Sequence, residues 1–199
     1  MKRQQELSFN QYKAIDLAIY AVILLVFEAV SVFAANSWFR GRPFTVSIVT
    51  LIVALVSVRW GWYSVIHAVL GGLVYSVCFS AARADVETSV YAIYAVGNAF
   101  SALSVVFVKL VGADRIRKNF LLMLSYVVLT YASIHLGHAV VSAVLGNGFG
   151  VIVNFLATDS VSLLFSVVAV FITSKLDGVF EDQKSYLLRT QKERENSEK

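Results

Sequence analysis

The chain has 199 residues, of which 58% are hydrophobic and only 15% are charged, and its formal net charge is +4. With a mean hydropathy of +0.71, this composition lies outside the range of soluble globular domains and indicates a polytopic membrane protein. The basic residues follow the ends of apolar runs, which argues against nucleic acid as the partner of the positive charge.

The predicted fold class is all-α, an integral membrane bundle of six transmembrane helices. A polar segment, residues 1–13, precedes a transmembrane domain over residues 14–176, and a charged tail over residues 177–199 follows it. A helix crosses the bilayer with about 20 apolar residues, and each run is near that length. The expected spans are residues 14–38, 44–58, 63–82, 88–111, 119–145 and 159–176.

Polar and glycine-rich joints separate these spans. Arg59 and two tryptophans form the joint at residues 59–62, which suits a turn at the lipid headgroups. Pro43 can begin the second span, since a first-turn proline loses no helical hydrogen bond. Three glycines at 146–150 (GNGFG) should end the fifth span. We expect a compact basic loop at residues 112–118.

Residues 151–158 are expected to form a loop or a short re-entrant piece, and Asp159 or Ser160 is expected to cap the sixth span. The tail should form a surface or frayed helix. No part of the chain is left over for a soluble domain.

The basic residues predict the orientation. With six spans and a cytoplasmic N-terminus, fourteen of the seventeen Lys and Arg residues fall in inside segments; Arg40, Arg42 and Arg83 fall outside. Cytoplasmic loops carry the excess of basic residues, so both termini are predicted to be cytoplasmic.

Polar and ionisable side chains within the spans are the candidate site, because such groups are costly at membrane depth and usually face protein or water. Most fall in the outward half of the spans. Two trios, at i, i+3, i+7 and at i, i+4, i+7, should each share one helix face. The predicted substrate-binding residues are Glu28, Tyr91, Tyr94, Asn98, Tyr131, His135, His138, Asn154 and Asp159.

The pattern predicts a small-molecule pocket open to the outside, in which Tyr and His stack on a planar ring while Asn, Glu and Asp select its polar edges. His67 lies apart from this group and is expected to be structural. Asp16, near the cytoplasmic headgroups, is expected to snorkel to the interface.

Other interpretations of the same residues remain open. Each His or Asn could bond another helix without any ligand, and Tyr91 could belong to an aromatic belt. Two histidines with two carboxylates could bind a metal, although no H-E-x-x-H pattern is present. We predict no metal, no cofactor and no catalytic residue. The single Cys78 excludes an intrachain disulfide, and the chain has no ATPase motif.

Small residues line one face at the start of the first span, where Ala14, Ala18 and Ala21 would let another helix approach closely. With this A-x-x-x-A pair, the six spans, the cytoplasmic termini and the run from Ser47 to Val77, the chain resembles the substrate-binding S components of energy-coupling factor (ECF) transporters, the vitamin importers of bacteria. The resemblance covers nearly the whole chain.

The resemblance implies a function and partners. An S component is a binding subunit, not an enzyme: it captures a vitamin or related micronutrient near the outer face of the bacterial cell membrane. It docks through its first helix, here Ala14, Ala18 and Ala21, on a transmembrane coupling subunit driven by two cytoplasmic ATPases. Glu28 and the GNGFG loop match no substrate-specific signature.

The main alternative is a free-standing transporter or channel, coupled to protons through His135, His138, Glu28 and Asp159. A membrane enzyme with a metal on this cluster and a structural membrane partner without a ligand are further alternatives. The two halves of the sequence show no convincing internal repeat, which counts against a secondary transporter.

Overall fold

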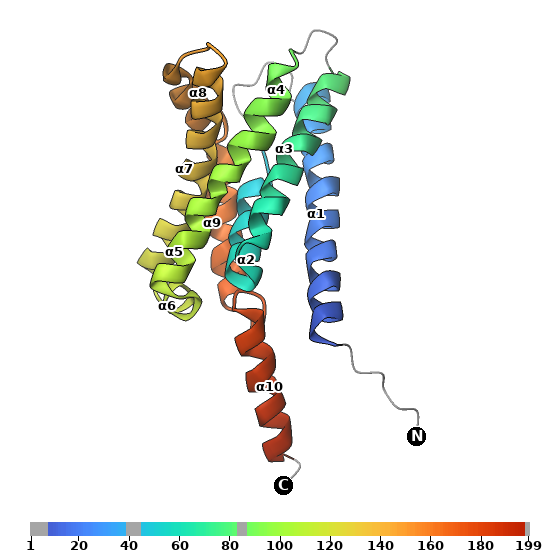
Figure 1. Ribbon diagram of the computed structural model, residues 1–199, viewed down its shortest axis with the longest axis vertical. Helices are drawn as coiled ribbons and strands as arrows, with labels where there is room; N and C mark the ends of the chain where they lie inside the picture. The colour runs from blue at the N-terminus through green and yellow to red at the C-terminus, as the bar shows by residue number, and fades with distance from the viewer. Residues whose placement is uncertain (1–7, 39–44, 83–86, 198–199) are drawn as a thin grey trace.

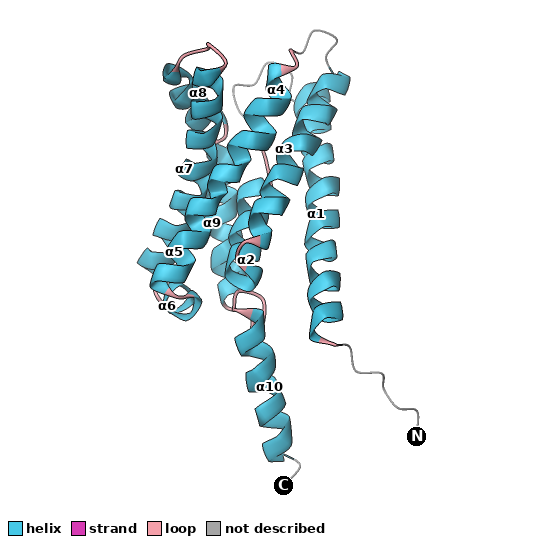
Figure 2. Ribbon diagram, viewed as in Figure 1, coloured by secondary structure: helices cyan, strands magenta, loops and turns pink. Residues whose placement is uncertain are grey.

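The computed structural model describes residues 8–38, 45–82 and 87–197, and this part of the chain is helical throughout, with short connections (Figure 2). Its α-helices are α1 (Phe9–Ser37), α2 (Val49–Trp60), α3 (Tyr63–Ala82), α4 (Ser89–Tyr91), α5 (Ala102–Val111), α6 (Ala113–Lys118), α7 (Phe120–Val144), α8 (Ile152–Thr158), α9 (Ser160–Ser174) and α10 (Gln183–Ser197). The short helices η1 (Ala92–Val96), η2 (Ala99–Ser101) and η3 (Phe149–Val151) join some of them.

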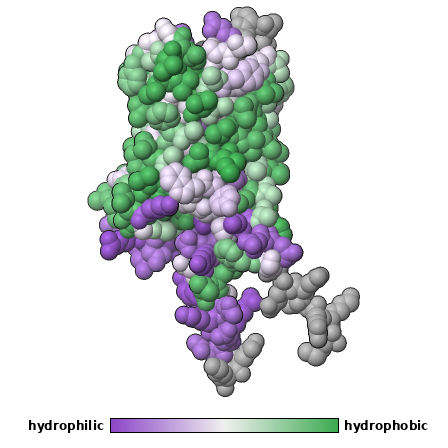
Figure 3. Space-filling view, in the orientation of Figure 1, coloured by the Kyte–Doolittle hydropathy of each residue, from purple (hydrophilic) through white to green (hydrophobic). Residues whose placement is uncertain are grey.

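Several of these helices are long and apolar enough to cross a bilayer, as in a multi-pass membrane protein. Within the described residues there are four: α1, α3, the unit from α4 to α5, and α7. A fifth is formed if α8 and α9, bent by 56° at their junction, count as one broken span. Apolar residues cover most of the visible bundle surface, and polar ones gather at the α10 end (Figure 3).

The remaining predicted span, residues 44–58, is much shorter than expected. Its helix, α2, has 12 residues, about 18 Å, against a hydrocarbon core of about 30 Å. Every α2 residue from Val49 to Arg59 is buried, because the helix is apolar all round and lies at the centre of the bundle. The start of α1 and the whole of α10 lie at the same end of the molecule (Figure 1).

An extended segment, residues 45–47, replaces the expected first turn of that span. Non-helical backbone at membrane depth must find partners within the protein. Thr45 N donates to the carbonyl oxygen of Thr158 (2.7 Å), and Ser47 N donates to Ser162 Oγ (2.7 Å). The segment is therefore held against the junction of α8 and α9, where a second helix is also interrupted.

The fourth span contains a π-helical turn, η1, between α4 and η2. Such turns are irregular and frequently occur at functional sites. Close backbone approach fixes this span on both sides. A Cβ at Gly72 would collide with the carbonyl of Tyr94, and a Cβ at Gly137 would collide with the carbonyl of Gly97. Only glycine lets α3 and α7 approach the irregular turn so closely.

Other predicted connections also differ in detail. The break at 146–150 is confirmed: α7 ends at Val144, and Gly146 and Gly148 have positive φ. Residues 152–158 form the helix α8, and 113–118 form the helix α6 instead of a compact loop. The side chain of Asp159 does not cap α9, because its backbone is not extended (φ −99°, ψ 12°). Pro43, Arg40, Arg42, Arg83 and most of the 83–87 turn lie outside the described residues.

Charged residues at the α10 end form what we call the base cluster: Asp16, Arg59, Arg117, Glu181 and Arg189. Arg59 holds Asp16 through two nitrogens (2.7 and 3.0 Å), and Trp60 Nε1 donates to the same carboxylate (2.5 Å). Asp16 is thus ion-paired within the protein, and the expectation that it snorkels was wrong. Arg59 also donates to the carbonyls of Gly178 and Val179, which tethers the chain entering α10.

Candidate functional site

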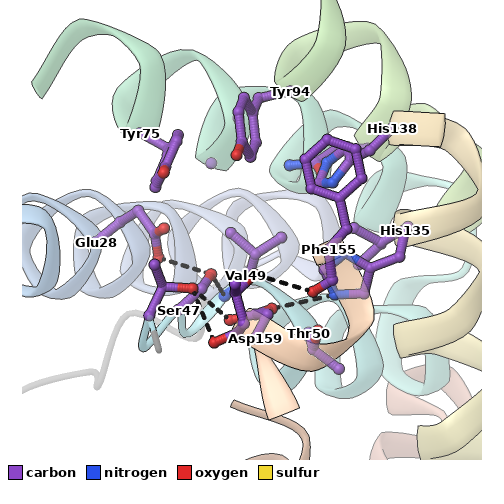
Figure 4. Close-up of a pocket in the computed structure, with 16 residues that line it drawn as sticks. Glu28, Ser47, Val49, Thr50, Tyr75, Tyr94, His135, His138, Phe155 and Asp159 are labelled. Carbon is purple, nitrogen blue, oxygen red and sulfur yellow. Dashed lines mark hydrogen bonds and ion pairs between the residues drawn. The ribbon is translucent and has the colours of Figure 1, made fainter. Parts of the chain in front are cut away.

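A partly open cavity lies between the start of α2, the junction of α8 and α9, and helices α1, α3, η1 and α7. It offers about 60 Å³ to the centres of water-sized molecules, which corresponds to several waters at about 10–15 Å³ each. Its walls come from the half of the bundle away from α10 (Figures 1 and 4). The lining residues are Glu28, Thr45, Ser47, Val49, Thr50, Gly71, Gly72, Tyr75, Tyr94, Asn98, Ile134, His135, His138, Phe155, Thr158 and Asp159.

Glu28 is one of two carboxyl groups in the wall, and its side chain is only 1% exposed. Its Oε2 accepts hydrogen bonds from Ser47 Oγ and from Ile48 N, both at 3.1 Å. The carboxyl group therefore accepts a hydrogen bond from a backbone N–H group at the start of α2. This position suits a carboxyl group, because the N-terminus of a helix is the positive end of its dipole. This accounts for a carboxylate in the middle of an apolar helix.

Asp159 is the second carboxyl group, at the junction of α8 and α9. It accepts hydrogen bonds from Ser162 Oγ and from Thr45 Oγ1 (3.3 Å). Its Oδ2 also lies 3.2 Å from His135 Nε2, at ion-pair distance but not aligned for a hydrogen bond. The interruption of the sixth span thus aims a carboxylate into the cavity and at α7.

An amide and an imidazole form a continuous chain of hydrogen bonds on the opposite wall. Asn98 Nδ2 donates to the carbonyl oxygen of Ala68 (2.7 Å), and Asn98 Oδ1 lies 2.7 Å from His138 Nε2. Both side chains are almost fully buried. The other ring nitrogen of His138, and both ring nitrogens of His135, are buried without a hydrogen-bond partner. Buried polar atoms without partners are rare in proteins, and a bound ligand is one explanation for them.

Aromatic rings complete the cavity. The rings of Tyr75 and Tyr94 pack with their centroids 4.2 Å apart and their planes tilted by 36°, and Tyr94 also contacts His138 (4.7 Å) and Phe155 (6.2 Å). In Figure 4 the two tyrosines lie on one side of the cavity and Glu28 and Asp159 on the other. A flat ligand could stack on one side while the carboxyl and imidazole groups bond to its edge.

Six of the nine residues predicted to bind substrate line this cavity: Glu28, Tyr94, Asn98, His135, His138 and Asp159. The trio on the fourth span does not stay on one face, because the π-helical turn changes the register between Tyr91 and Asn98. Tyr91 is accordingly outside the wall and half-buried. Asn154 lies on an exposed part of α8.

Tyr131 is also outside the wall, but it supports it. Its hydroxyl donates to the carbonyl oxygen of Leu156 in α8 (2.6 Å), and its ring packs against His135 at 4.3 Å. It therefore orients His135 and connects α7 to α8. His67, predicted to be structural, contacts the carbonyl oxygens of Tyr63 and Leu17 with its two ring nitrogens.

The sequence reasoning missed the lining residues of the extended segment and of α3. Thr45 and Ser47 were assigned to a regular helix, where a hydroxyl usually bonds its own backbone. Hydroxyl and carboxyl side chains near residues 45–47 and near the junction of α8 and α9 could have indicated the two helix interruptions. Such side chains can replace the backbone hydrogen-bond partners that an interrupted helix lacks. Tyr75, one turn after the Gly71 and Gly72 pair, has no charged residue or histidine near it in sequence to mark it.

The three alanines predicted to face a partner lie on the outer side of α1. Ala14 and Ala18 are exposed and Ala21 is half-buried. The opposite side of α1 packs on α3 and α2. The small-residue face is therefore accessible from outside the bundle.

Comparison with known proteins gives no match to this chain among family descriptions, curated proteins or solved structures.

Proposed function

We propose that this protein is the substrate-binding subunit of an ATP-driven importer of the energy-coupling factor type. In this proposal it lies in a bacterial cell membrane with both termini in the cytoplasm and captures a vitamin or related small planar micronutrient. The observation that carries the proposal is the cavity in the half away from α10, which is lined by aromatic rings and by histidine nitrogens without hydrogen-bond partners. Ligand sites are typically concave, mostly apolar and supplied with a few such polar groups.

Two further features support a subunit that depends on partners. The sequence has no nucleotide-binding motif, so energy for uptake would come from another chain. The exposed alanine face of α1 offers a place where a transmembrane partner could pack closely. In the proposed complex this partner is the coupling subunit, and two cytoplasmic ATPases bind to it.

The test is affinity purification of the tagged chain from its native membranes, with mass spectrometry of what accompanies it. We expect a transmembrane coupling subunit and two ATPases. Replacing Ala14 and Ala18 together by leucine should abolish this assembly and leave ligand binding by the isolated subunit unchanged. Ala81→Leu, at an exposed alanine of α3, is the matched control and should leave assembly intact. Assembly that survives the double replacement would contradict the docking proposal.

A free-standing proton-coupled transporter is a second candidate, favoured by one observation. Glu28 and Asp159 lie where two helices are interrupted, and interrupted helices with ionisable groups are common at the sites of secondary transporters. Reconstitution of the purified chain alone into vesicles separates the two candidates. Substrate accumulation driven by a proton gradient, without ATPases, would establish the second candidate and rule out the first.

A further inference from the structure

The hydrogen-bond chain through Asn98 determines what His138 can offer a ligand. Asn98 Nδ2 donates to Ala68 O, so Asn98 Oδ1 must be the acceptor for His138. His138 Nε2 therefore carries the hydrogen, and in the neutral ring Nδ1 is left with a lone pair. Nδ1 is buried and has no partner. A ligand at this position would have to donate a hydrogen bond.

The carboxyl groups offer acceptors as well. Each already receives hydrogen bonds from neighbouring hydroxyl or amide groups, Glu28 from Ser47 and Ile48, and Asp159 from Ser162 and Thr45. These neighbours supply hydrogens but no full positive charge, and the imidazole that faces a carboxyl group is His135, whose Nε2 lies 3.2 Å from Asp159 Oδ2. Among the lining residues that the structure describes, none is Lys or Arg.

A cation can lower the cost of negative charge in such a wall. A buried carboxyl group is costly to ionise unless a positive charge compensates it, so a bound cation would favour the ionised forms of Glu28 and Asp159, whose side chains are largely buried. In addition, the rings of Tyr75, Tyr94 and Phe155 line the same cavity. The faces of aromatic rings attract cations, most strongly where water is excluded.

We propose that the cavity binds a small, flat organic cation with N–H donors, such as a protonated amine or amidine on a heteroaromatic ring, and rejects anions. The cation would lie between the tyrosines and the two carboxyl groups and donate to His138 Nδ1. This assignment rests on the proposed function of the site as a substrate pocket and adds the charge of the substrate to it.

The test uses matched probes on the isolated subunit in detergent at pH 7, measured by isothermal titration calorimetry. 3-(Aminomethyl)pyridine, nicotinamide and nicotinate share one ring and are cationic, neutral and anionic. We expect the amine to bind at least about tenfold more tightly than nicotinate. Equal or tighter binding of nicotinate, or no binding of the amine at millimolar concentration, would overturn the proposal.

Variants locate the preference in the cavity. Glu28→Gln removes the carboxyl group that can become negative beside a bound cation and keeps an oxygen for Ser47 and Ile48, and it should reduce the amine-to-nicotinate affinity ratio about tenfold. Glu87→Gln is the matched control at an exposed carboxylate and should leave the ratio unchanged. If Glu28→Gln does not fold, as judged by thermal unfolding, Asp159→Asn provides the same readout. An unchanged ratio in the folded variant overturns the proposal.

These measurements need no partner chain, so the two proposals can fail separately. Loss of the charge preference would leave assembly with ATPases untouched. Conversely, a chain that never assembles with ATPases could still show the preference for the cationic probe.

Discussion

At the α10 end of the bundle the charged side chains are bonded to one another, whereas the imidazole and carboxyl groups around the cavity keep bonding positions open. In the base cluster, Arg59 pairs with Asp16, and Glu181 receives both Arg117 and Arg189. Around the cavity, three ring nitrogens of His135 and His138 have no hydrogen-bond partner. Buried charges that are fully paired can be explained by a structural role alone. Buried nitrogens without a hydrogen-bond partner are better explained by a ligand that bonds to them.

The largest expected effect breaks the base cluster. Arg59→Ala would leave Asp16 as a partly buried charge without its partner and should lower the free energy of unfolding by about 3–5 kcal/mol. Arg115→Ala, at an exposed arginine of α6, is the control and should change it by less than about 0.5 kcal/mol. Denaturant unfolding in detergent, followed by circular dichroism, measures both.

The double variant Arg59→Met with Asp16→Asn sharpens the interpretation. It removes both charges, so it should be more stable than Arg59→Ala alone. If the double variant is the less stable of the two, packing of the arginine stem matters more than the charge pair. The base cluster would then no longer serve as an example of charges held by pairing.

Sequence reasoning found the apolar helices and most of the cavity's ionisable residues, because both signals are local. Apolar runs predict spans, and ionisable residues within them predict inward-facing sites. The interruption at residues 45–47 was not predictable in this way. It depends on partners far along the chain, Thr158 and Ser162, and hydropathy cannot distinguish a short central helix from a full span.

Two individual residues show the same limit. Tyr91 was placed with Asn98 by regular helical spacing, and the π-helical turn between them breaks that spacing. Asp16 is expected to snorkel because of its position near the cytoplasmic end of the first span. Its partner, Arg59, lies 43 residues away on α2. Long-range pairs and helix irregularities are therefore where the sequence interpretation failed.

A smaller effect should separate two neighbouring residues of the cavity. Asn98→Ala leaves His138 Nε2 without its acceptor and should cost about 1–3 kcal/mol of stability as well as ligand affinity. His135→Phe removes two nitrogens that have no hydrogen-bond partner and keeps a ring against Tyr131. It also removes the contact between His135 Nε2 and Asp159 Oδ2 (3.2 Å), but no hydrogen bond, so it should cost less stability than Asn98→Ala and still weaken ligand binding more than tenfold, about 1.4 kcal/mol.

Unfolding in detergent and titration of the cationic probe give the two readouts for each variant. If His135→Phe is strongly destabilised and binds the probe normally, His135 is a structural residue and the open positions have no functional meaning. Normal binding by Asn98→Ala would show that the orientation of His138 does not matter for the ligand.

The smallest expected effect concerns the start of α2, where Ser47 Oγ donates to Glu28 and accepts from Val49 N (3.2 Å). Ser47→Ala removes both hydrogen bonds in a buried place and should cost about 0.5–1.5 kcal/mol. Ser89→Ala is a matched control, because Ser89 donates to the carboxylate of Glu87 at an exposed site. It should cost less than about 0.5 kcal/mol.

The two serines differ in burial and in the one additional hydrogen bond that Ser47 Oγ accepts from Val49 N. Both hydroxyls donate to a carboxylate at similar distance, 3.1 Å and 3.0 Å. Water can replace the partner of Glu87, whereas nothing near Glu28 can replace Ser47 unless water enters from the cavity. Equal losses of stability in the two variants would therefore mean that water fills the cavity up to the start of α2. The carboxyl group of Glu28 would then be solvated by water and would not need a cation to compensate it.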